Sequence, residues 1–232
     1  MSITLYNGDC LEEMKNIPSG SVDLILTEPP YIISNNTEFG KWDIKEYTSL
    51  YNVFNVFYDK LKIGGTVICF YDLWKIGELK TIMEENKFKQ IRFIEWVKKN
   101  PVPINSKTNY LTNSREIALS CVKESKPVFN AEYDNGIYSY PICHDKDRFH
   151  PTQKPVALME ELIKKHSTKG SIVLDSFMGS GSTGIACINT NRNFIGIEKA
   201  PYFFRLAKER IDNHKKPAII SNETTKPGVL DI

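Results

Sequence analysis

Features of membrane-spanning, secreted and disulfide-rich proteins are scarce in this sequence of 232 residues. Its five cysteines are scattered and odd in number, which does not suit a disulfide framework and favours a reducing compartment. No apolar run approaches the ~18 residues of a membrane span, and no basic stretch leads into an apolar run near the first residue. The formal net charge of +2 is too small to indicate a nucleic-acid partner by itself. We therefore expect a cytoplasmic protein without membrane association.

The composition is that of an ordinary globular domain, and the hydrophobic pattern alternates between strands and helices. Hydrophobic residues make up 41% and charged residues 25% of the chain, as in soluble domains. Short apolar runs predict seven strands, at Ile3–Tyr6, Val22–Leu26, Thr66–Tyr71, Ile91–Val97, Glu116–Val122, Ile172–Asp175 and Phe194–Glu198. Helical periodicity predicts six helices, at Leu11–Ile17, Glu46–Leu61, Trp74–Asn86, Val156–His166, Thr183–Thr190 and Pro201–Asn213. This alternation indicates a doubly wound, mostly parallel α/β sheet.

A rigid turn follows the strand predicted at Val22–Leu26, where residues 27–31 read Thr-Glu-Pro-Pro-Tyr. Proline cannot donate to a strand ladder, so the pair ends the strand abruptly. Ligand sites of open α/β sheets lie at such carboxyl ends. The carboxylate of Glu28, the carbonyl of Pro29 and the ring of Tyr31 suit a planar base that carries an amino group. By itself the segment is equally well explained as a turn beside a core tyrosine.

A second segment has the pattern of a nucleoside-binding βαβ unit. A glycine-rich turn over residues 176–184 separates the strand at Ile172–Asp175 from the next helix, and Glu198 ends the following strand. The spacing G-x-G-x-x-G, with an acidic residue ~20 positions later, lets backbone approach a nucleoside and offers a carboxylate to its ribose. It is met by Gly179, Gly181 and Gly184. The pattern does not distinguish one nucleoside cofactor from another, so NAD remains an alternative.

Five segments together resemble the β group of amino-group DNA methyltransferases. Residues 27–31 look like their catalytic (Asp/Asn/Ser)-Pro-Pro-Tyr motif. Residues 175–183 look like their S-adenosylmethionine loop, usually Asp-Pro-Phe-x-Gly-Ser-Gly-Thr-Thr. Residues 150–155, His-Pro-Thr-Gln-Lys-Pro, are similar to the motif before that loop. Gly-Asp-Cys at residues 8–10 and Trp-Val-Lys-Lys-Asn-Pro at 96–101 match further family segments.

The resemblance extends from about Ile3 to Arg210 and implies a Rossmann-like S-adenosylmethionine-dependent methyltransferase fold. It implies one methyltransferase domain over residues 1–213, with a short target-recognition insertion near 99–149. Residues 214–232 are polar, contain two prolines and are expected to form a loose tail.

The implied reaction moves a methyl group from S-adenosylmethionine to the exocyclic amine of a base flipped out of double-stranded DNA. Glu28 and the Pro29 carbonyl would accept the amine's hydrogens, Pro30 would stiffen the turn, and Tyr31 would stack on the base. Adenine N6 is favoured over cytosine N4, because an acidic residue before Pro-Pro-Tyr is more usual in the adenine enzymes. Cytosine N4 remains an alternative.

Cofactor contacts also follow from the resemblance. Asp9 would hold the cofactor's adenine and Glu198 its ribose, while Thr152 and Lys154 would line its methionine end. The other implied contacts lie beside Asp9 or in the glycine-rich loop; they are Cys10, Asp175, Phe177, Gly179, Ser180, Gly181, Ser182 and Thr183.

DNA contacts are implied in the segment between the Trp96 region and His150, which has a small excess of basic residues. Side chains suited to phosphates or base edges are Lys98, Lys99, Asn100, Lys107, Asn109, Arg115 and Arg148. The part between Val122 and His150 is short for target recognition, which suits a short site, a homodimer or a partner subunit. A companion restriction endonuclease is a further partner compatible with the resemblance.

Glu28 departs from the family pattern, because it adds one methylene to the usual aspartate. Its carboxylate must fold back by roughly 1.5 Å to reach the same point, and a misplacement of about 1 Å can cost ~100-fold in rate. Three readings stay open: a tolerated variant, a weak enzyme, or a relative that binds DNA and cofactor without turnover. The intact remaining motifs favour a working enzyme.

Two other classes of function fit less well. A dehydrogenase using NAD(P) would leave residues 28–31 and 150–155 unexplained. Cys143, His144 and His150 suggest zinc, but no fourth ligand stands at zinc-finger spacing. We therefore expect no metal.

Overall fold

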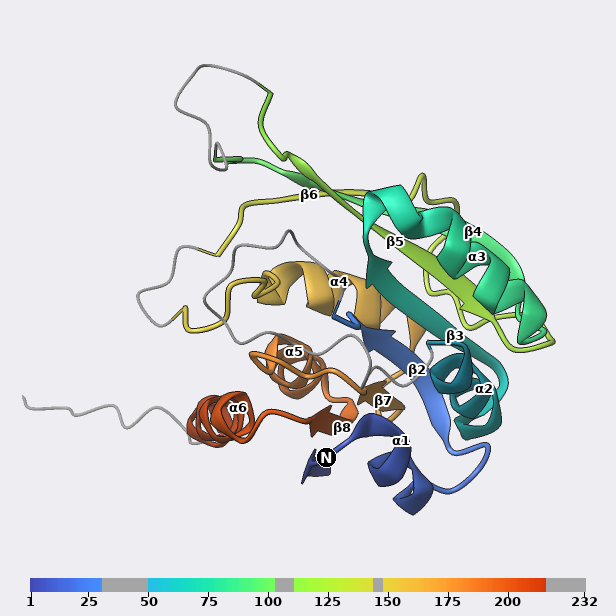
Figure 1. Cartoon of the computed structure of the whole chain (residues 1–232), viewed down its shortest axis with the longest axis horizontal. Coiled ribbons are helices and arrows are strands. Elements are labelled where there is room, and N and C mark those ends of the chain that lie inside the picture. Colours follow the sequence, from blue (N-terminus) through green and yellow to red (C-terminus); the bar gives the residue numbers. More distant parts are fainter. Residues whose placement is uncertain (31–49, 103–110, 144–147, 216–232) are drawn as a thin grey trace, which may run out of the picture.

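Eight strands form one sheet between two layers of helices in the computed structural model, which describes residues 1–30, 50–102, 111–143 and 148–215 (Figure 1). The strands are β1 Ile3–Asn7, β2 Val22–Thr27, β3 Leu61–Tyr71, β4 Lys89–Lys98, β5 Arg115–Val122, β6 Ile137–Tyr140, β7 Ile172–Asp175 and β8 Asn193–Glu198. The helices are α1 Cys10–Glu13, α2 Leu50–Lys60, α3 Ile76–Glu85, α4 Val156–His166, α5 Ser182–Thr190 and α6 Pro201–Lys215, with 3-10 turns η1 Met14–Asn16 and η3 Leu73–Lys75.

The sheet is mostly parallel, with the order β1-β8-β7-β2-β3-β5-β4-β6. Only β5 runs against its neighbours, β3 and β4, among the described strands. The chain proceeds from β2 to β3 on one side and from β7 to β8 on the other, so the order reverses between β2 and β7. This reversal is the topological switch point of a doubly wound fold, and the predicted α/β architecture is confirmed.

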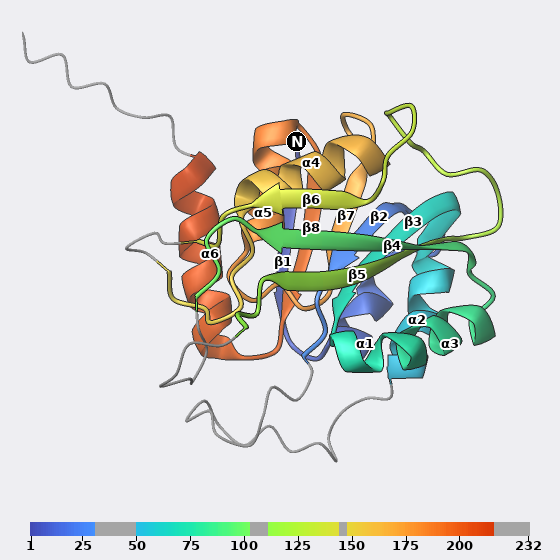
Figure 2. The same ribbon diagram turned by 90° about the horizontal axis from the view of Figure 1, so that it is seen from above.

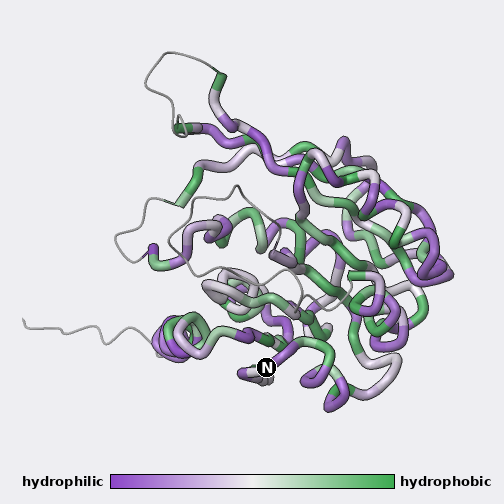
Figure 3. Tube along the Cα trace, in the orientation of Figure 1, coloured by the Kyte–Doolittle hydropathy of each residue, from purple (hydrophilic) through white to green (hydrophobic). Residues whose placement is uncertain are grey.

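Two hydrophobic cores lie on opposite faces of the sheet, because successive side chains of a strand point to opposite faces. On β2, Leu24 and Leu26 belong to the core under α4, α5 and α6, whereas Ile25 belongs to the core under α1, α2 and α3. Figure 2 shows these two groups of helices on either side of the sheet. Figure 3 shows hydrophobic residues along the central strands, whereas the helices mix polar and hydrophobic residues. The edge where the parallel strands end is therefore held from both faces.

Within the described ranges the sheet has one strand more than the seven predicted. Strand β6 pairs in parallel with β4, beginning with Ile137 beside Glu95. A turn directly precedes this strand. In it Asp134 accepts a hydrogen bond from the Gly136 N–H at 2.7 Å, and Gly136 adopts a φ of +73°. The strand has only four residues, with mixed polarity and no clear apolar run, so sequence periodicity gave no signal for it. The predicted recognition segment thus contributes two strands, β5 and β6, to the sheet.

Other boundaries differ locally. The helix predicted at Leu11–Ile17 divides into α1 and η1, and the one predicted to end at Asn213 extends to Lys215. The predicted start at Glu46 and the tail beyond Lys215 lie outside the described residues. Among the described helices, none has the length and apolarity to span a membrane.

A substitution of Gly196 on β8 tests how closely the sheet packs against the loop after β7. A Cβ at this position would lie 2.5 Å from Met178 Sδ and 2.7 Å from the Phe194 ring, so Gly196→Ala forces side chains to shift. We expect it to lower the free energy of unfolding by about 1–3 kcal/mol, measured by urea denaturation. The control is Gly77→Ala in α3, where a Cβ meets nothing within 4 Å. It should raise stability by up to ~1 kcal/mol; equal effects of the two substitutions would contradict this packing.

Candidate functional site

The strands that carry the predicted site residues are neighbours and end at the same edge of the sheet. Parallel pairing sets Asn7 at the end of β1 beside Glu198 at the end of β8, and Asp175 at the end of β7 beside Gly196. Strand β7 in turn pairs with β2, whose last residue is Thr27. This edge lies at the topological switch point, where open α/β sheets bind their ligands.

The carboxylate of Asp175 ties three segments together at this edge. It accepts hydrogen bonds from Thr27 Oγ1 at 2.8 Å, Thr183 Oγ1 at 2.7 Å and the Phe177 N–H at 3.2 Å. Burial raises the pKa of Asp175 to about 6, although these hydrogen bonds favour the ionised form. We predicted that Asp175 and Thr183 contact a cofactor. In the structure their side-chain oxygens bond to each other, so both support the loop from inside the protein.

Glycine is required at three places in the loop from β7 into α5. Gly179 has a φ of +50° and Gly181 a φ of +75°, a region that glycine adopts readily. A Cβ on Gly179 would also stand 3.4 Å from His150 Nε2. Gly184 serves close packing, because a Cβ there would lie 2.8 Å from the Phe194 ring on β8. Residues 178–184 are buried in the structure, so the glycines let the loop turn tightly and pack closely against its neighbours.

Two carboxylates extend the site along the sheet edge. Glu198 accepts hydrogen bonds from the Gly179 N–H at 2.9 Å and the Ala200 N–H at 2.8 Å, and burial raises its pKa. Asp9 caps α1 by accepting a hydrogen bond from the Leu11 N–H at 3.0 Å. Each carboxylate oxygen has two acceptor positions, so these bonds orient both groups and leave capacity for ribose or base hydrogens.

The remaining cofactor-loop candidates differ in what they contact. Burial and the charge of Asp9 raise the pKa of Cys10 to about 12, so its thiol is neutral and suits a pocket wall. Ser180 and Ser182 lie 3.1 Å apart at their hydroxyls, and Arg210 donates to both residues. These serines therefore anchor the loop to α6. Phe177 is partly buried and packs against the core that lies under α1 to α3.

The segment 150–155 packs against the glycine-rich loop through a residue that was not among the predicted contacts. The His150 ring lies 4.6 Å from the Phe203 ring, and its Nδ1 lies 3.2 Å from Thr152 Oγ1. Burial and then the charge of Lys154 lower the pKa of His150 to about 4, so the ring is neutral at pH 7. In the sequence, the indication of a role for His150 at this site was its place at the start of the His-Pro-Thr-Gln-Lys-Pro segment.

Glu28 meets a buried lysine at the end of β2. Lys154 Nζ lies 2.5 Å from Glu28 Oε2 and 2.9 Å from Glu116 Oε2. Lys154 is 5% exposed, and the Glu28 side chain is 16% exposed. Pro29 is buried and Pro30 exposed. Lys154 was predicted to line the cofactor's methionine end, whereas its ammonium stands between two carboxylates.

Two residues predicted to contact DNA also hold protein segments together. Lys98 is paired with Glu116 at 2.8 Å, and its side chain is only 10% exposed. Asn100 Oδ1 accepts a hydrogen bond from the Ile142 N–H at 2.8 Å. Their contact with DNA stays a prediction, because the amide Nδ2 of Asn100 and the further N–H groups of Lys98 can still donate. No sequence pattern pointed to Glu116, which became visible only through the pairing of β5 with β4.

Other predicted DNA contacts lie on the surface. Lys99 and Arg148 are exposed, and Arg148 donates to the Pro151 carbonyl. The Arg115 side chain is 65% exposed and stands 3.2 Å from Glu95. Three predicted site residues lie outside the described ranges: Tyr31, Lys107 and Asn109.

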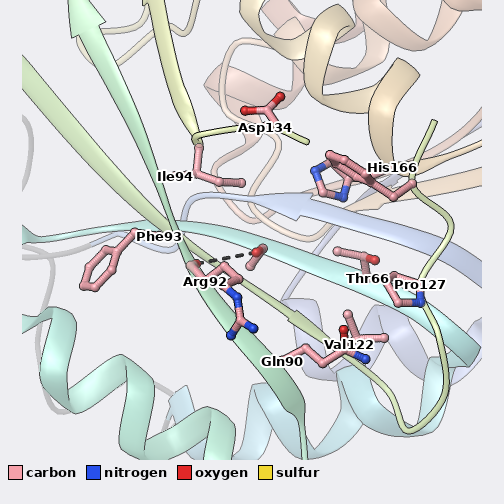
Figure 4. Close-up of a pocket in the computed structure, with 11 residues that line it drawn as sticks. Thr66, Gln90, Arg92, Phe93, Ile94, Val122, Pro127, Asp134 and His166 are labelled. Atoms are coloured by element: carbon pink, nitrogen blue, oxygen red, sulfur yellow. Dashed lines mark hydrogen bonds between the residues drawn. The ribbon is translucent and has the colours of Figure 1, made fainter. Parts of the chain in front are cut away.

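A separate cavity of about 200 Å³ lies toward the other end of β3, β4 and β5 (Figure 4). Its lining includes Thr66, Arg92, Val122 and His166. Neither the Thr66 hydroxyl nor His166 Nδ1 has a hydrogen-bond partner among the described residues. Val122 ends β5, whereas the candidate site lies where β5 begins, so this cavity is not part of it. Within the described ranges no cluster of His, Cys, Asp or Glu could hold a metal ion, and His144 lies outside them.

A family model described as DNA methylase matches residues 22–209. The chain belongs to this DNA methylase family. The methylase is 31% identical to the type II methyltransferase M2.MboI of Moraxella bovis, over 96% of this chain and 91% of the relative. It is 29% identical to M.HinfI of Haemophilus influenzae, over 90% of this chain and 68% of the relative.

Solved structures agree with this assignment. The M1.HpyAVI–SAM complex is 34% identical with a TM-score of 0.74, covering 90% of this chain and 99% of that one. The cytosine-N4-specific PvuII DNA methyltransferase is 19% identical with a TM-score of 0.74, over 92% of this chain and 91% of that one, which shows the fold alone. The predicted family and fold of the methylase are confirmed, and the predicted cofactor, S-adenosylmethionine, agrees with the first complex.

Asp175 predicts a specific pH dependence of stability. Its pKa rises from 3.8 to about 6 on folding, so the folded state holds a proton that the unfolded state has released between these values. The contribution is complete below about pH 4 and is lost as pH rises through about 6, by up to about 3 kcal/mol. We expect the unfolding free energy of the wild type to fall over this window relative to Asp175→Asn, measured by urea denaturation. A constant difference between the two proteins would contradict the raised pKa.

Proposed function

We propose that the methylase transfers a methyl group from S-adenosylmethionine to N6 of adenine in double-stranded DNA. One observation supports this most strongly: Thr27 Oγ1 donates to Asp175 Oδ1 at 2.8 Å. The bond joins the residue before Glu28 to the residue that begins the glycine-rich loop, 148 positions away in sequence. The acceptor expected to hold the target amine thereby stands next to the loop expected to hold the cofactor.

The order of residues along the sheet edge fits the parts of the cofactor. Asp9 follows β1, Glu198 ends β8, the glycine-rich loop follows β7, and Glu28 follows β2. Neighbouring strands lie about 4.8 Å apart, so these four strands span roughly 14 Å. Adenine at Asp9, ribose at Glu198 and the methionine end at the loop would direct the sulfonium methyl toward Glu28.

The chemistry proposed for Glu28 is positioning and electrostatic stabilisation. The lone pair of an exocyclic amine is delocalised into the base, so the amine is a weak nucleophile. A carboxylate of Glu28 and the Pro29 carbonyl would accept its two hydrogens and turn the lone pair toward the methyl group. Bound S-adenosylmethionine supplies an electrophilic methyl group, and transfer forms the N–C bond as the C–S bond breaks. The displaced amine proton would leave through the Glu28 carboxylate. The neutral thiol of Cys10 is not required.

The preference for adenine rests on the acidic residue at position 28, which is more usual in the adenine enzymes of the family. A single domain over residues 1–213, a homodimer, a companion restriction endonuclease and a cytoplasmic location stay predictions. Lys99, Arg115 and Arg148 are the exposed cations proposed to contact phosphates.

Methyl transfer to unmethylated duplex DNA tests the reaction and the base together. We expect labelled methyl from S-adenosylmethionine to be recovered as N6-methyladenine by nucleoside mass spectrometry. N4-methylcytosine would contradict the choice of base. No transfer, with DNA and cofactor still bound, would contradict turnover and favour a binding relative. Stabilisation against heat by NAD but not by S-adenosylmethionine would favour a dehydrogenase.

Removing the carboxylate of Glu28 tests its role in the chemical step. Glu28→Ala should slow single-turnover transfer by ~100-fold or more, while the affinity for S-adenosylmethionine stays within ~3-fold of the wild type. The control is Glu12→Ala. It removes an exposed glutamate whose carboxylate lies 2.5 Å from Lys15 Nζ. A Glu28→Ala rate equal to that of the control would contradict the catalytic role.

A further inference from the structure

Four side chains of alternating charge form a continuous chain behind the catalytic turn. Glu28 Oε2 stands 2.5 Å from Lys154 Nζ, and this nitrogen stands 2.9 Å from Glu116 Oε2. Glu116 Oε1 stands 2.8 Å from Lys98 Nζ. Each charge has an oppositely charged neighbour, and the two anions and two cations give the group no net formal charge. Burial alone would raise the pKa of Glu116, but the charges of Lys154 and Lys98 outweigh it and lower the pKa.

The ammonium of Lys154 is fixed from several directions. Its side chain is 5% exposed and lies over the Phe70 ring, with Nζ 5.3 Å from the ring centroid. Nζ also lies 3.4 Å from the carbonyl of Thr152. A buried cation is costly unless it is paired and hydrogen-bonded, and leaving this position would cost Lys154 its contacts with both carboxylates. Lys154 is therefore a fixed point against which Glu28 is held.

The length of Glu28 matches this fixed point. Aspartate at position 28 would withdraw the carboxylate by about one C–C bond, ~1.5 Å, and would open the 2.5 Å pair to a separation too long for a direct hydrogen bond. The departure of this chain from the family's usual aspartate thus coincides with a buried ammonium that the longer side chain meets directly.

We propose that Lys154 is a positioning residue that holds the Glu28 carboxylate for the target amine, and that glutamate at position 28 and Lys154 act as a matched pair. The proposal rests on the proposed methyl transfer. Because a carboxylate offers about four acceptor positions, the ion pair orients Glu28 and leaves acceptor capacity for the amine N–H.

Lys154→Met separates this role from the cofactor contact predicted by resemblance. The variant keeps the approximate length of the side chain and removes its charge. We expect single-turnover methyl transfer to slow by ~100-fold, with the dissociation constant for S-adenosylmethionine within ~3-fold of the wild type. Loss of cofactor affinity by the same factor as the rate would overturn the proposal, as would an unchanged rate.

Lys165→Met provides the matched control. Lys165 also bridges two carboxylates, Asp134 at 2.5 Å and Glu161 at 2.6 Å, but it lies at the far end of α4. Its removal should lower the melting temperature without slowing transfer at a temperature where the variant is folded. If both variants lose rate in proportion to stability, Lys154 is structural and the proposal fails.

Exchange of side-chain lengths tests the matched pair directly. Glu28→Asp should slow transfer by ~10-fold or more despite restoring the family's usual residue, because its carboxylate no longer reaches Lys154. Lys154→Arg extends the cation, so Glu28→Asp combined with Lys154→Arg should recover at least ~3-fold of the loss. Glu28→Asp as fast as the wild type would overturn the pairing.

The wild type and the Lys154→Met variant together distinguish failure of the proposed methyl transfer from failure of the positioning role. Wild-type protein that binds S-adenosylmethionine but transfers no methyl group to DNA contradicts the proposed function. Wild-type transfer that is insensitive to Lys154→Met contradicts only the positioning role.

Discussion

The hydrogen bond between Thr27 and Asp175 is the constraint on which the rest of the site depends. It joins the ends of β2 and β7, the two strands at which the sheet order reverses. The turn after β2 and the glycine-rich loop are far apart in sequence, and the pairing of β2 with β7 makes them neighbours. Asp175 also accepts from Thr183 at the start of α5, so strand, loop and helix share one buried acceptor. Because Asp175 is 4% exposed, its partners cannot be exchanged for water without opening the core.

Several ionisable side chains are buried or partly buried at this edge of the sheet. Burial raises the pKa values of Asp175 and Glu198 and lowers that of His150, as expected where ionised groups lose contact with water. Lys154 keeps two carboxylates beside it in the same environment. Electrostatic interactions are stronger where the effective dielectric constant is low, so small displacements of Glu28 change its interaction with an amine considerably. The surrounding protein therefore fixes the carboxylate before any substrate arrives.

Periodicity and motifs predicted the parts of the fold that local sequence determines. Helix α4 and strand β7 have the predicted bounds, Val156–His166 and Ile172–Asp175, because each has a clear apolar pattern and a distinct end. Strand β6 was missed because its four residues gain their strand conformation from pairing with β4. The motifs fall at one edge of the sheet, but they did not predict the partners of each side chain. The pairing of Lys154 with Glu28 and Glu116 depends on contacts between residues 38 or more positions apart, which spacing along the chain does not reveal.

The most direct test of the central claim is a crystal structure of the methylase with S-adenosylhomocysteine and duplex DNA containing its recognition sequence. The account predicts the cofactor along the ends of β1, β8 and β7, a flipped adenine with N6 within hydrogen-bonding distance of Glu28, and Lys154 still paired with that carboxylate. A structure in which Lys154 binds the cofactor's carboxylate, and Glu28 points away from the flipped base, would contradict it.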